Sequence, residues 1–157
     1  MTNRPSGNPT PTFEVIRLDH VQLAMPPGRE EDAERFYSGL LGLERVAKPA
    51  ALARRGGCWF GRGPVQLHLG SEADFRPARK AHPALVVRGY DALLAKLTDA
   101  GFVPRPADEL PGIRRCHIDD PFGNRIELIE GQGADQDCGS GQFGDSGTPY
   151  ATRRGGS

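Results

Sequence analysis

The sequence repeats one order of strand and helix signals, and this duplication constrains the fold more than any other feature. His82 lies 62 positions after His20, each in a strand-like run, and Gly101 lies 59 positions after Gly42, each after a helical pattern. A period of about 60 residues in two copies indicates a duplicated module, because a solenoid needs at least three repeats. The sequence therefore predicts two modules in one domain, and they cover about 14–70 and 80–131.

Each module is predicted to have the order βαβββ, which makes the fold class α+β. Alternating apolar residues predict the strands, and apolar residues spaced i, i+3, i+4 and i+7 before a glycine predict the helices. The segment 47–57 is predicted to be a mobile loop, and DDPFGN is predicted to be a tight turn. The predicted strands are 16–25, 43–47, 57–60, 65–69, 82–87, 102–105, 112–118 and 125–130, and the predicted helices are 33–41 and 90–97.

Composition excludes several classes of protein. The 157 residues include 20 basic and 20 acidic side chains, so no net charge attracts nucleic acid or an acidic membrane surface. No apolar run approaches the roughly 18 residues of a membrane span, and the N-terminus lacks the apolar core of a signal peptide. The three cysteines have neither metal-site spacing nor the even number of a disulfide framework. We therefore expect a cytoplasmic protein without nucleic-acid or membrane partners.

Apolar side chains are concentrated in the middle of the chain. Of the 33 Leu, Ile, Val and Phe residues, 31 lie within residues 14–131. Segments with so few apolar groups cannot offset their ordering entropy by burial. Residues 1–13 are therefore predicted to be a flexible leader and 132–157 a Gly-rich flexible tail, with an arm that orders on a partner as the alternative for the tail.

Strand alternation separates an apolar face, which belongs under the helices, from a face that carries metal-binding and proton-handling groups. Two imidazoles, one carboxylate and one amide oxygen suit a divalent metal, and this donor set does not distinguish Zn, Ni, Mn, Co and Fe. His20 matches His82 at an offset of 62, and Gln66 matches Glu127 at an offset of 61, so these four residues are the predicted ligands. The alternatives are hydrogen-bonded core histidines, a solvated glutamate, and a Gln66 that donates a hydrogen bond to a ligand instead of binding the metal. The polar face carries His20, Gln66, His68, His82, His117 and Glu127.

Four stretches of the chain, LDHVQLAM, RFYSGLLGL, HPALVV and DPFGNRIELIE, resemble the vicinal oxygen chelate superfamily. This superfamily contains glyoxalase I, fosfomycin thiol transferases, extradiol dioxygenases and bleomycin-binding resistance proteins. The resemblance covers about residues 14–131. It implies paired βαβββ modules that form a curved, partly open mixed sheet around a cleft, commonly in a homodimer. It also implies His20, His82 and Glu127 as metal ligands, with Gln66 where glyoxalase I has a second carboxylate.

The resemblance implies a metal-dependent enzyme of the lyase, isomerase or transferase type. Such an enzyme stabilises an oxyanion of a small oxygen-rich substrate by Lewis-acid catalysis. The alternatives are a metal-free protein that binds a drug or metabolite, as bleomycin-binding relatives do, and an extradiol-type dioxygenase. Several positions differ from named family members: Ala24 replaces the arginine of glyoxalase I, while Gln22 and His117 replace a threonine and a tyrosine of fosfomycin transferases.

The remaining candidate residues fall into two groups. Glu127, His68 and His117 are predicted to move protons. The second group is predicted to bind substrate: the arginines suit an anionic group, and one of the two adjacent aromatic residues must face the cleft. Its members are Gln22, Trp59, Phe60, Arg115 and Arg125.

Overall fold

The computed structural model describes residues 13–131. The predicted tail and all but the last residue of the predicted leader lie outside these residues, so both remain predictions. Within 13–131, none of the helices has the length and apolar character that crossing a bilayer requires.

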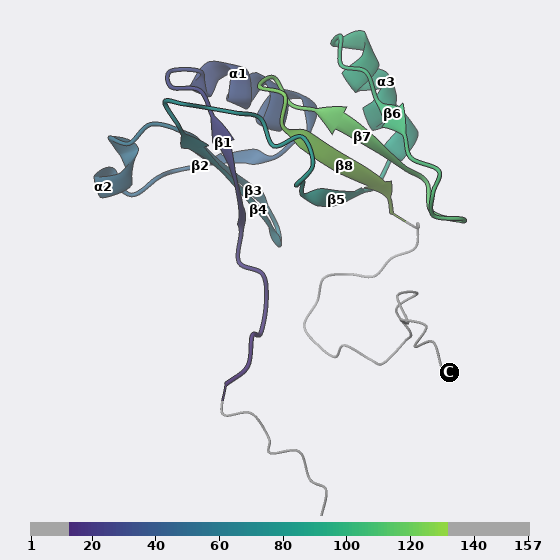
Figure 1. The fold of residues 1–157 in the computed structure, drawn as a ribbon, viewed down its shortest axis with the longest axis horizontal. Coiled ribbons are helices and arrows are strands. Elements are labelled where there is room, and N and C mark those ends of the chain that lie inside the picture. The colour runs from purple at the N-terminus through teal and green to yellow at the C-terminus, as the bar shows by residue number, and fades with distance from the viewer. Residues whose placement is uncertain (1–12, 132–157) are drawn as a thin grey trace, which may run out of the picture.

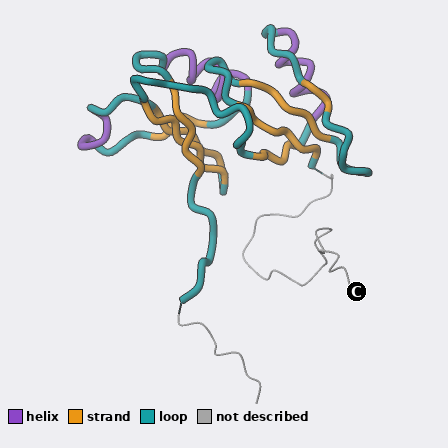
Figure 2. Tube along the Cα trace, in the orientation of Figure 1, coloured by secondary structure: helices purple, strands orange, loops and turns teal. Residues whose placement is uncertain are grey.

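The described chain folds as two βαβββ modules, each with its own mixed sheet (Figure 1). Figure 2 shows the same path with the strands of the two modules in separate groups. The first module contains β1 (Val21–Met25), α1 (Glu30–Glu34), the π-helix η1 (Arg35–Leu40), β2 (Glu44–Val46), α2 (Ala50–Ala53), β3 (Cys58–Arg62) and β4 (Val65–Ser71). The second contains β5 (Ala84–Val87), α3 (Tyr90–Asp99), β6 (Arg105–Pro106), β7 (Arg115–Asp119) and β8 (Arg125–Glu130).

The two sheets have the same strand order. The first is β1-β4-β3-β2 and the second is β5-β8-β7-β6. In each sheet the first pair, β1 with β4 or β5 with β8, is parallel, and the other pairs are antiparallel. The duplication predicted from the sequence is thus confirmed, as is the α+β class.

Three predicted elements differ in detail. The first strand begins at Val21 rather than residue 16, because residues 13–20 pair with no strand in the described structure. The predicted loop 47–57 contains the single turn of α2, which begins directly after Pro49, a residue suited to the start of a helix. The predicted first helix continues as a π-helix, η1, and its end is marked by Gly42 at φ 71°.

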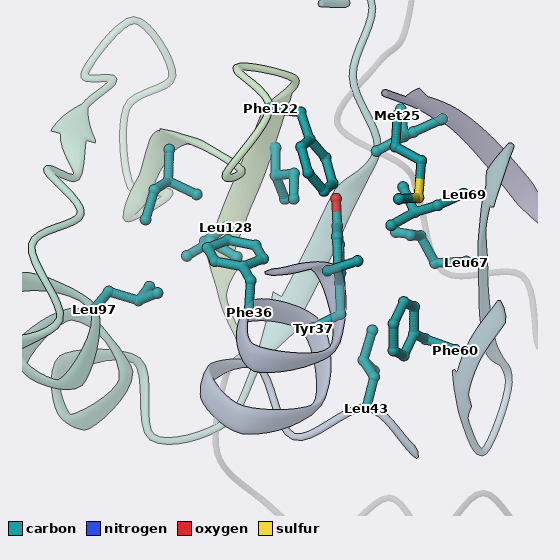
Figure 3. Close-up of a cluster of buried hydrophobic side chains, with 14 of the residues drawn as sticks. Met25, Phe36, Tyr37, Leu43, Phe60, Leu67, Leu69, Leu97, Phe122 and Leu128 are labelled. Carbon is teal, nitrogen blue, oxygen red and sulfur yellow. The ribbon is translucent and has the colours of Figure 1, made fainter. Parts of the chain in front are cut away.

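One hydrophobic core joins the two modules. Figure 3 shows Phe36 and Tyr37 of η1 between the side chains of the two sheets, with Phe60 and Leu67 on one side and Leu128 on the other. All five side chains are almost fully buried. Burial of a side chain of this size contributes roughly 1.5–3 kcal/mol. The apolar faces of both sheets therefore pack against shared helices, and the opposite faces are left for the polar side chains.

The strand register determines which residues of the two modules correspond. Gln22 lies opposite His68, and Ala84 lies opposite Glu127, in the equivalent parallel pairs. His20 and His82 each lie two positions before these first-strand residues, so they correspond. The register therefore makes His68, rather than Gln66, the counterpart of Glu127.

The antiparallel neighbours agree with this correspondence. Trp59 lies opposite His68, and His117 lies opposite Glu127. The offset of 61 between Gln66 and Glu127, predicted from the sequence, is therefore wrong by two residues, and the correct offset for β4 and β8 is 59. The error came from loops whose lengths the strand patterns do not fix. Gln66 corresponds instead to Arg125.

Candidate metal centre

Three side chains of the second module converge on the polar face of its sheet. His82, just before β5, His117 on β7 and Glu127 on β8 each present one donor atom, and the three atoms lie within 4.8 Å of one another. Glu127 and His117 face each other across an antiparallel pair, and His82 approaches from the neighbouring parallel strand. Alternate side chains of a strand lie on the same face of the sheet. Because these strands are paired with one another, residues far apart in the sequence meet on that face.

The His82 ring is oriented by the backbone. Its Nδ1 lies 2.7 Å from the carbonyl oxygen of Lys80, and its Nε2 lies 3.1 Å from Oε2 of Glu127. A carbonyl oxygen only accepts hydrogen bonds, so Nδ1 carries the proton and donates it. Nε2 is thereby directed into the cluster, where a bound metal ion would replace its contact with Glu127, the arrangement found around metal-bound histidines.

Glu127 is buried and held by an arginine. Nη1 of Arg115 donates to Oε1 of Glu127 at 2.7 Å, and Nη2 donates to Glu109 at 2.6 Å. Burial raises the pKa of Glu127, but the hydrogen bonds from Arg115 and His82 outweigh burial, so its pKa lies below the ordinary value. Glu127 is therefore a carboxylate at neutral pH.

His117 completes the cluster as a neutral imidazole. Its ring meets the ring of His82 edge to face, with centroids 5.1 Å apart. Burial lowers the pKa of His117, Glu127 opposes that shift, and the charge of Arg125 lowers the pKa further. An imidazole that is unprotonated at neutral pH can act either as a metal ligand or as a general base.

The donor chemistry of this cluster fits a first-row divalent metal. Two imidazoles and one carboxylate match the ligands used by catalytic zinc and by similar ions, and three protein ligands leave at least one position for water or substrate. The orienting contacts from Lys80 and Arg115 add the outer support that such sites have. We refer to His82, His117 and Glu127 as the second-module cluster.

The corresponding residues of the first module form a stack of rings. His20 and His68 are stacked with centroids 4.1 Å apart, and Trp59 stacks on His68 at 4.2 Å with an interplanar angle of 10°. Nδ1 of His20 also lies 3.0 Å from Asp19. Burial and the neighbouring His20 lower the pKa of His68. We call His20, His68 and Trp59 the first-module stack.

The predicted ligands His20 and Gln66 lie outside the second-module cluster. Both line an open pocket of about 390 Å³ between the modules, and His82 lies on the opposite wall of the same pocket. The Gln66 side chain lies over Gly61, where an added Cβ would come within 2.8 Å of its Oε1. The structure thus brings together two of the four predicted ligands and adds His117, which the sequence analysis had named only for proton transfer.

The predicted substrate-binding residues occupy different environments. Phe60 is fully buried in the core, where its ring stacks on Tyr37 with centroids 5.2 Å apart. Its prediction as a cleft residue is therefore wrong. The alternation of strand faces instead leaves its neighbour Trp59 on the polar face. Gln22 is exposed on β1.

Of the two predicted arginines, only Arg125 lacks a carboxylate partner among residues 13–131. Arg115 is engaged by Glu127 and Glu109, which favours a role in positioning Glu127 over a role in binding substrate.

Two partners of the cluster were missed by sequence reasoning. The carbonyl oxygen of Lys80 carries no sequence signal, because every residue has one. The ion pair of Arg115 with Glu127 did have a signal: strand alternation places both on the polar face of adjacent strands, where opposite charges attract. The contact of Glu109 with Arg115 depends on the conformation of a loop, which no sequence pattern specifies.

Comparison with known proteins agrees with this fold. The chain matches the family described as Glyoxalase/Bleomycin resistance protein/Dioxygenase superfamily over residues 13–128. A glyoxalase family protein from Bacillus anthracis is 41% identical, with a TM-score of 0.73, and the match covers 76% of this chain and 98% of that one. None of the curated proteins matches the chain.

Two more distant structures share the fold alone. A fosfomycin resistance protein from Listeria monocytogenes is 13% identical, with a TM-score of 0.61, over 76% of this chain and 96% of that one. An antibiotic binding protein from Streptomyces is 21% identical, with a TM-score of 0.59, over 76% of this chain and 99% of that one. The family match, the duplicated modules and the similarity to the Bacillus anthracis protein lead to one conclusion: this chain belongs to the Glyoxalase/Bleomycin resistance protein/Dioxygenase superfamily.

Proposed function

We propose that the protein is a divalent-metal-dependent enzyme that acts on a small, oxygen-rich substrate as a lyase, isomerase or transferase. The observation that carries the proposal is the convergence of His82, His117 and Glu127 on one face of the second sheet. A divalent ion held there would supply Lewis-acid stabilisation of an oxyanion that develops on the substrate.

The residues of the chain have separate roles in this proposal. His82 and Glu127 hold the ion, because the Lys80 carbonyl and the Arg115 guanidinium orient them. His117 either completes the ligand set or, as a neutral imidazole, takes a proton from the substrate. His68, the other predicted proton carrier, lies in the first-module stack and would act on a substrate that reaches both modules.

Metal titration of the full chain tests the proposal. Wild-type protein purified without a chelator or a metal-binding tag is expected to bind about one divalent ion per chain, measured by calorimetry with Zn²⁺, Mn²⁺ and Ni²⁺. Replacement of His82 or Glu127 by Ala is expected to weaken binding at least about 10- to 100-fold, the range seen for loss of groups that support a metal site. The matched control is Gln22→Ala, an exposed polar residue of the other sheet that lies outside the cluster and outside the predicted ligand set.

The same titration distinguishes the remaining ligand proposals. If His20 contributes to the site, His20→Ala weakens binding as strongly as His82→Ala. If the second-module cluster is the whole site, His117→Ala has that effect and His20→Ala does not. A wild-type protein that binds none of the three ions would contradict the enzyme proposal.

A second candidate function is metal-free binding of a planar drug or metabolite. The first-module stack favours it, because the outer ring, His20, has a side chain that is 40% exposed and offers a flat surface to an aromatic ligand. The distant Streptomyces relative is an antibiotic binding protein. Trp59 is the only tryptophan, so a change in its fluorescence on adding a planar ligand to metal-free protein would support this candidate.

The proposed working form is a cytoplasmic homodimer. Apolar side chains of the segment before β1 are highly exposed in the single chain, which is an unfavourable arrangement in water. A second copy would cover them. The segment extends away from the body of the molecule in Figure 1 and includes Phe13, Val15, Ile16 and Leu18, which are 76–87% exposed.

A further inference from the structure

We propose that Arg125 binds a carboxylate group of the substrate, so that the substrate is a small organic acid whose other oxygens reach the second-module cluster. The inference rests on the proposed function for those other oxygens. The binding of the carboxylate itself depends only on Arg125 and its surroundings.

Arg125 lies beside the cluster on the same face of the same strand. It precedes Glu127 by two positions on β8, so their side chains leave the sheet on one side about 7 Å apart along the strand. His117 lies diagonally across the antiparallel pair, opposite Glu127. The effect of the Arg125 charge on the pKa of His117 agrees with this proximity.

The carboxylate nearest to Arg125 by register is already engaged. Asp119 lies opposite Arg125 on β7, but its two oxygens accept hydrogen bonds from Arg105 at 2.7 and 3.0 Å. Among residues 13–131 no carboxylate lies within 4.0 Å of the Arg125 guanidinium. Its Nε is also buried without a hydrogen-bond partner there. A half-buried guanidinium with an unsatisfied donor is costly unless a ligand supplies the acceptor.

The charges on this face indicate an anion as that ligand. Arg105 pairs with Asp119, and Arg115 pairs with both Glu127 and Glu109. Together with Arg125, this side of the sheet carries three arginines and three carboxylates. The charges of these six groups therefore sum to zero before any metal binds. A divalent ion would add two positive charges, and a bound acid would offset them.

The planar shape of the Arg125 guanidinium favours a carboxylate over a larger oxyanion. One planar guanidinium matches the two oxygens of a carboxylate with two parallel hydrogen bonds. The neighbouring cations, Arg105 and Arg115, are committed to carboxylates of the protein. The first module has Gln66 at the position that corresponds to Arg125, so this positive charge is specific to the second module.

A pair of matched probes tests the inference. 2-Oxoglutarate and 2-oxovalerate share the metal-chelating 2-oxo acid group, and only the former carries a second carboxylate. We expect Zn²⁺-loaded wild-type protein to bind 2-oxoglutarate about 10- to 100-fold more tightly in calorimetry, the range for a hydrogen-bonded ion pair. Arg125→Gln should remove this preference without weakening Zn²⁺ binding, and Arg125→Lys should retain part of it.

The matched control is Arg114→Gln, which removes an equal charge just before β7, where Asp91 and Glu130 engage it. This variant should keep the preference. Equal affinity for the two probes in wild type, or a preference that survives Arg125→Gln, would overturn the inference.

A failure of the proposed function would give a different result in these titrations. If the wild-type protein binds no Zn²⁺, the metal proposal fails, and the same titrations of metal-free protein still report on Arg125. A preference for 2-oxoglutarate that is lost in Arg125→Gln then supports the carboxylate site, and its absence overturns it. The melting temperature of each variant confirms that it is folded.

Discussion

At the scale of single residues, the chemistry of the candidate site depends on how Glu127 is held. The carboxylate is buried, and two donors, Arg115 and His82, occupy its oxygens. These contacts keep it ionised and oriented without any metal. The same contacts define how its protonation is coupled to folding.

Replacing Arg115 by Gln is expected to make stability less dependent on pH in the acid range. The pKa of Glu127 is lower in the folded protein than the ordinary value of 4.5, so its contribution is present above pH 4.5 and is lost as the pH falls through the folded pKa. Without the Arg115 guanidinium the folded pKa rises toward 4.5 or above, and this contribution shrinks.

Urea unfolding of both proteins between pH 7 and pH 3.5 measures the effect. Other carboxyls with lowered pKa values, such as Asp32 and Asp91, contribute equally in both proteins, so the difference between the two curves reports on the carboxylates that Arg115 contacts, the buried Glu127 and the exposed Glu109. Curves of equal slope would show that Arg115 does not control the ionisation of Glu127.

At the scale of elements, the turn between β7 and β8 connects the two modules. Asp120 in this turn accepts hydrogen bonds from the Tyr37 hydroxyl of η1, from two backbone amides of the turn and from the Asn124 side chain. Asn124 in turn donates to the carbonyl oxygen of Ala24 on β1 and accepts from the amide of Ala78. One turn of the second module is thus bound to a strand and a helix of the first.

Replacing Asp120 by Asn is expected to lower the free energy of unfolding by about 2 kcal/mol or more, because an amide nitrogen would face donors that now point at a carboxylate oxygen. The matched control is Asp119→Asn, the adjacent residue, whose exposed ion pair with Arg105 is worth about 1 kcal/mol or less. Urea unfolding at pH 7 compares the variants. Equal losses in the two proteins would mean that the buried network adds no stability of its own.

At the scale of the whole molecule, two similar sheets share one core and present two different polar faces. The first carries stacked rings, and the second carries the second-module cluster, a candidate metal centre, with Arg125 beside it. The duplication thus conserves the core while the chemistry of the polar faces has diverged. The apolar segment before β1 is the part that a single copy leaves most exposed.

The proposed dimer gives a prediction at this scale. Light scattering of the full chain is expected to give twice the mass of the 17.0 kDa chain. Ile16→Asp is expected to shift the equilibrium toward the single chain, because a charge would have to be buried in the interface. Arg17→Gln, at the next position, is the control for a change in the same segment. A monomeric wild type would contradict the dimer, and a dimer unaffected by Ile16→Asp would place the interface elsewhere.

The sequence by itself determined the duplicated βαβββ order, the α+β class and the polar face of each sheet. These depend on local periodicity, which side-chain alternation and helical spacing reveal without tertiary information. It also identified His82 and Glu127 as neighbours on the polar face. The strands were found within a few residues, and the largest error was the start of β1.

Only the tertiary structure decided which residues meet. Register depends on loop lengths and on packing between strands distant in sequence, so a shift of two residues keeps every side chain on its predicted face and leaves no trace in the pattern. That shift exchanged Gln66 for His68 as the counterpart of Glu127. The same long-range pairing brought His117 into the cluster, committed Arg115 to Glu127 and left Arg125 with an unsatisfied donor.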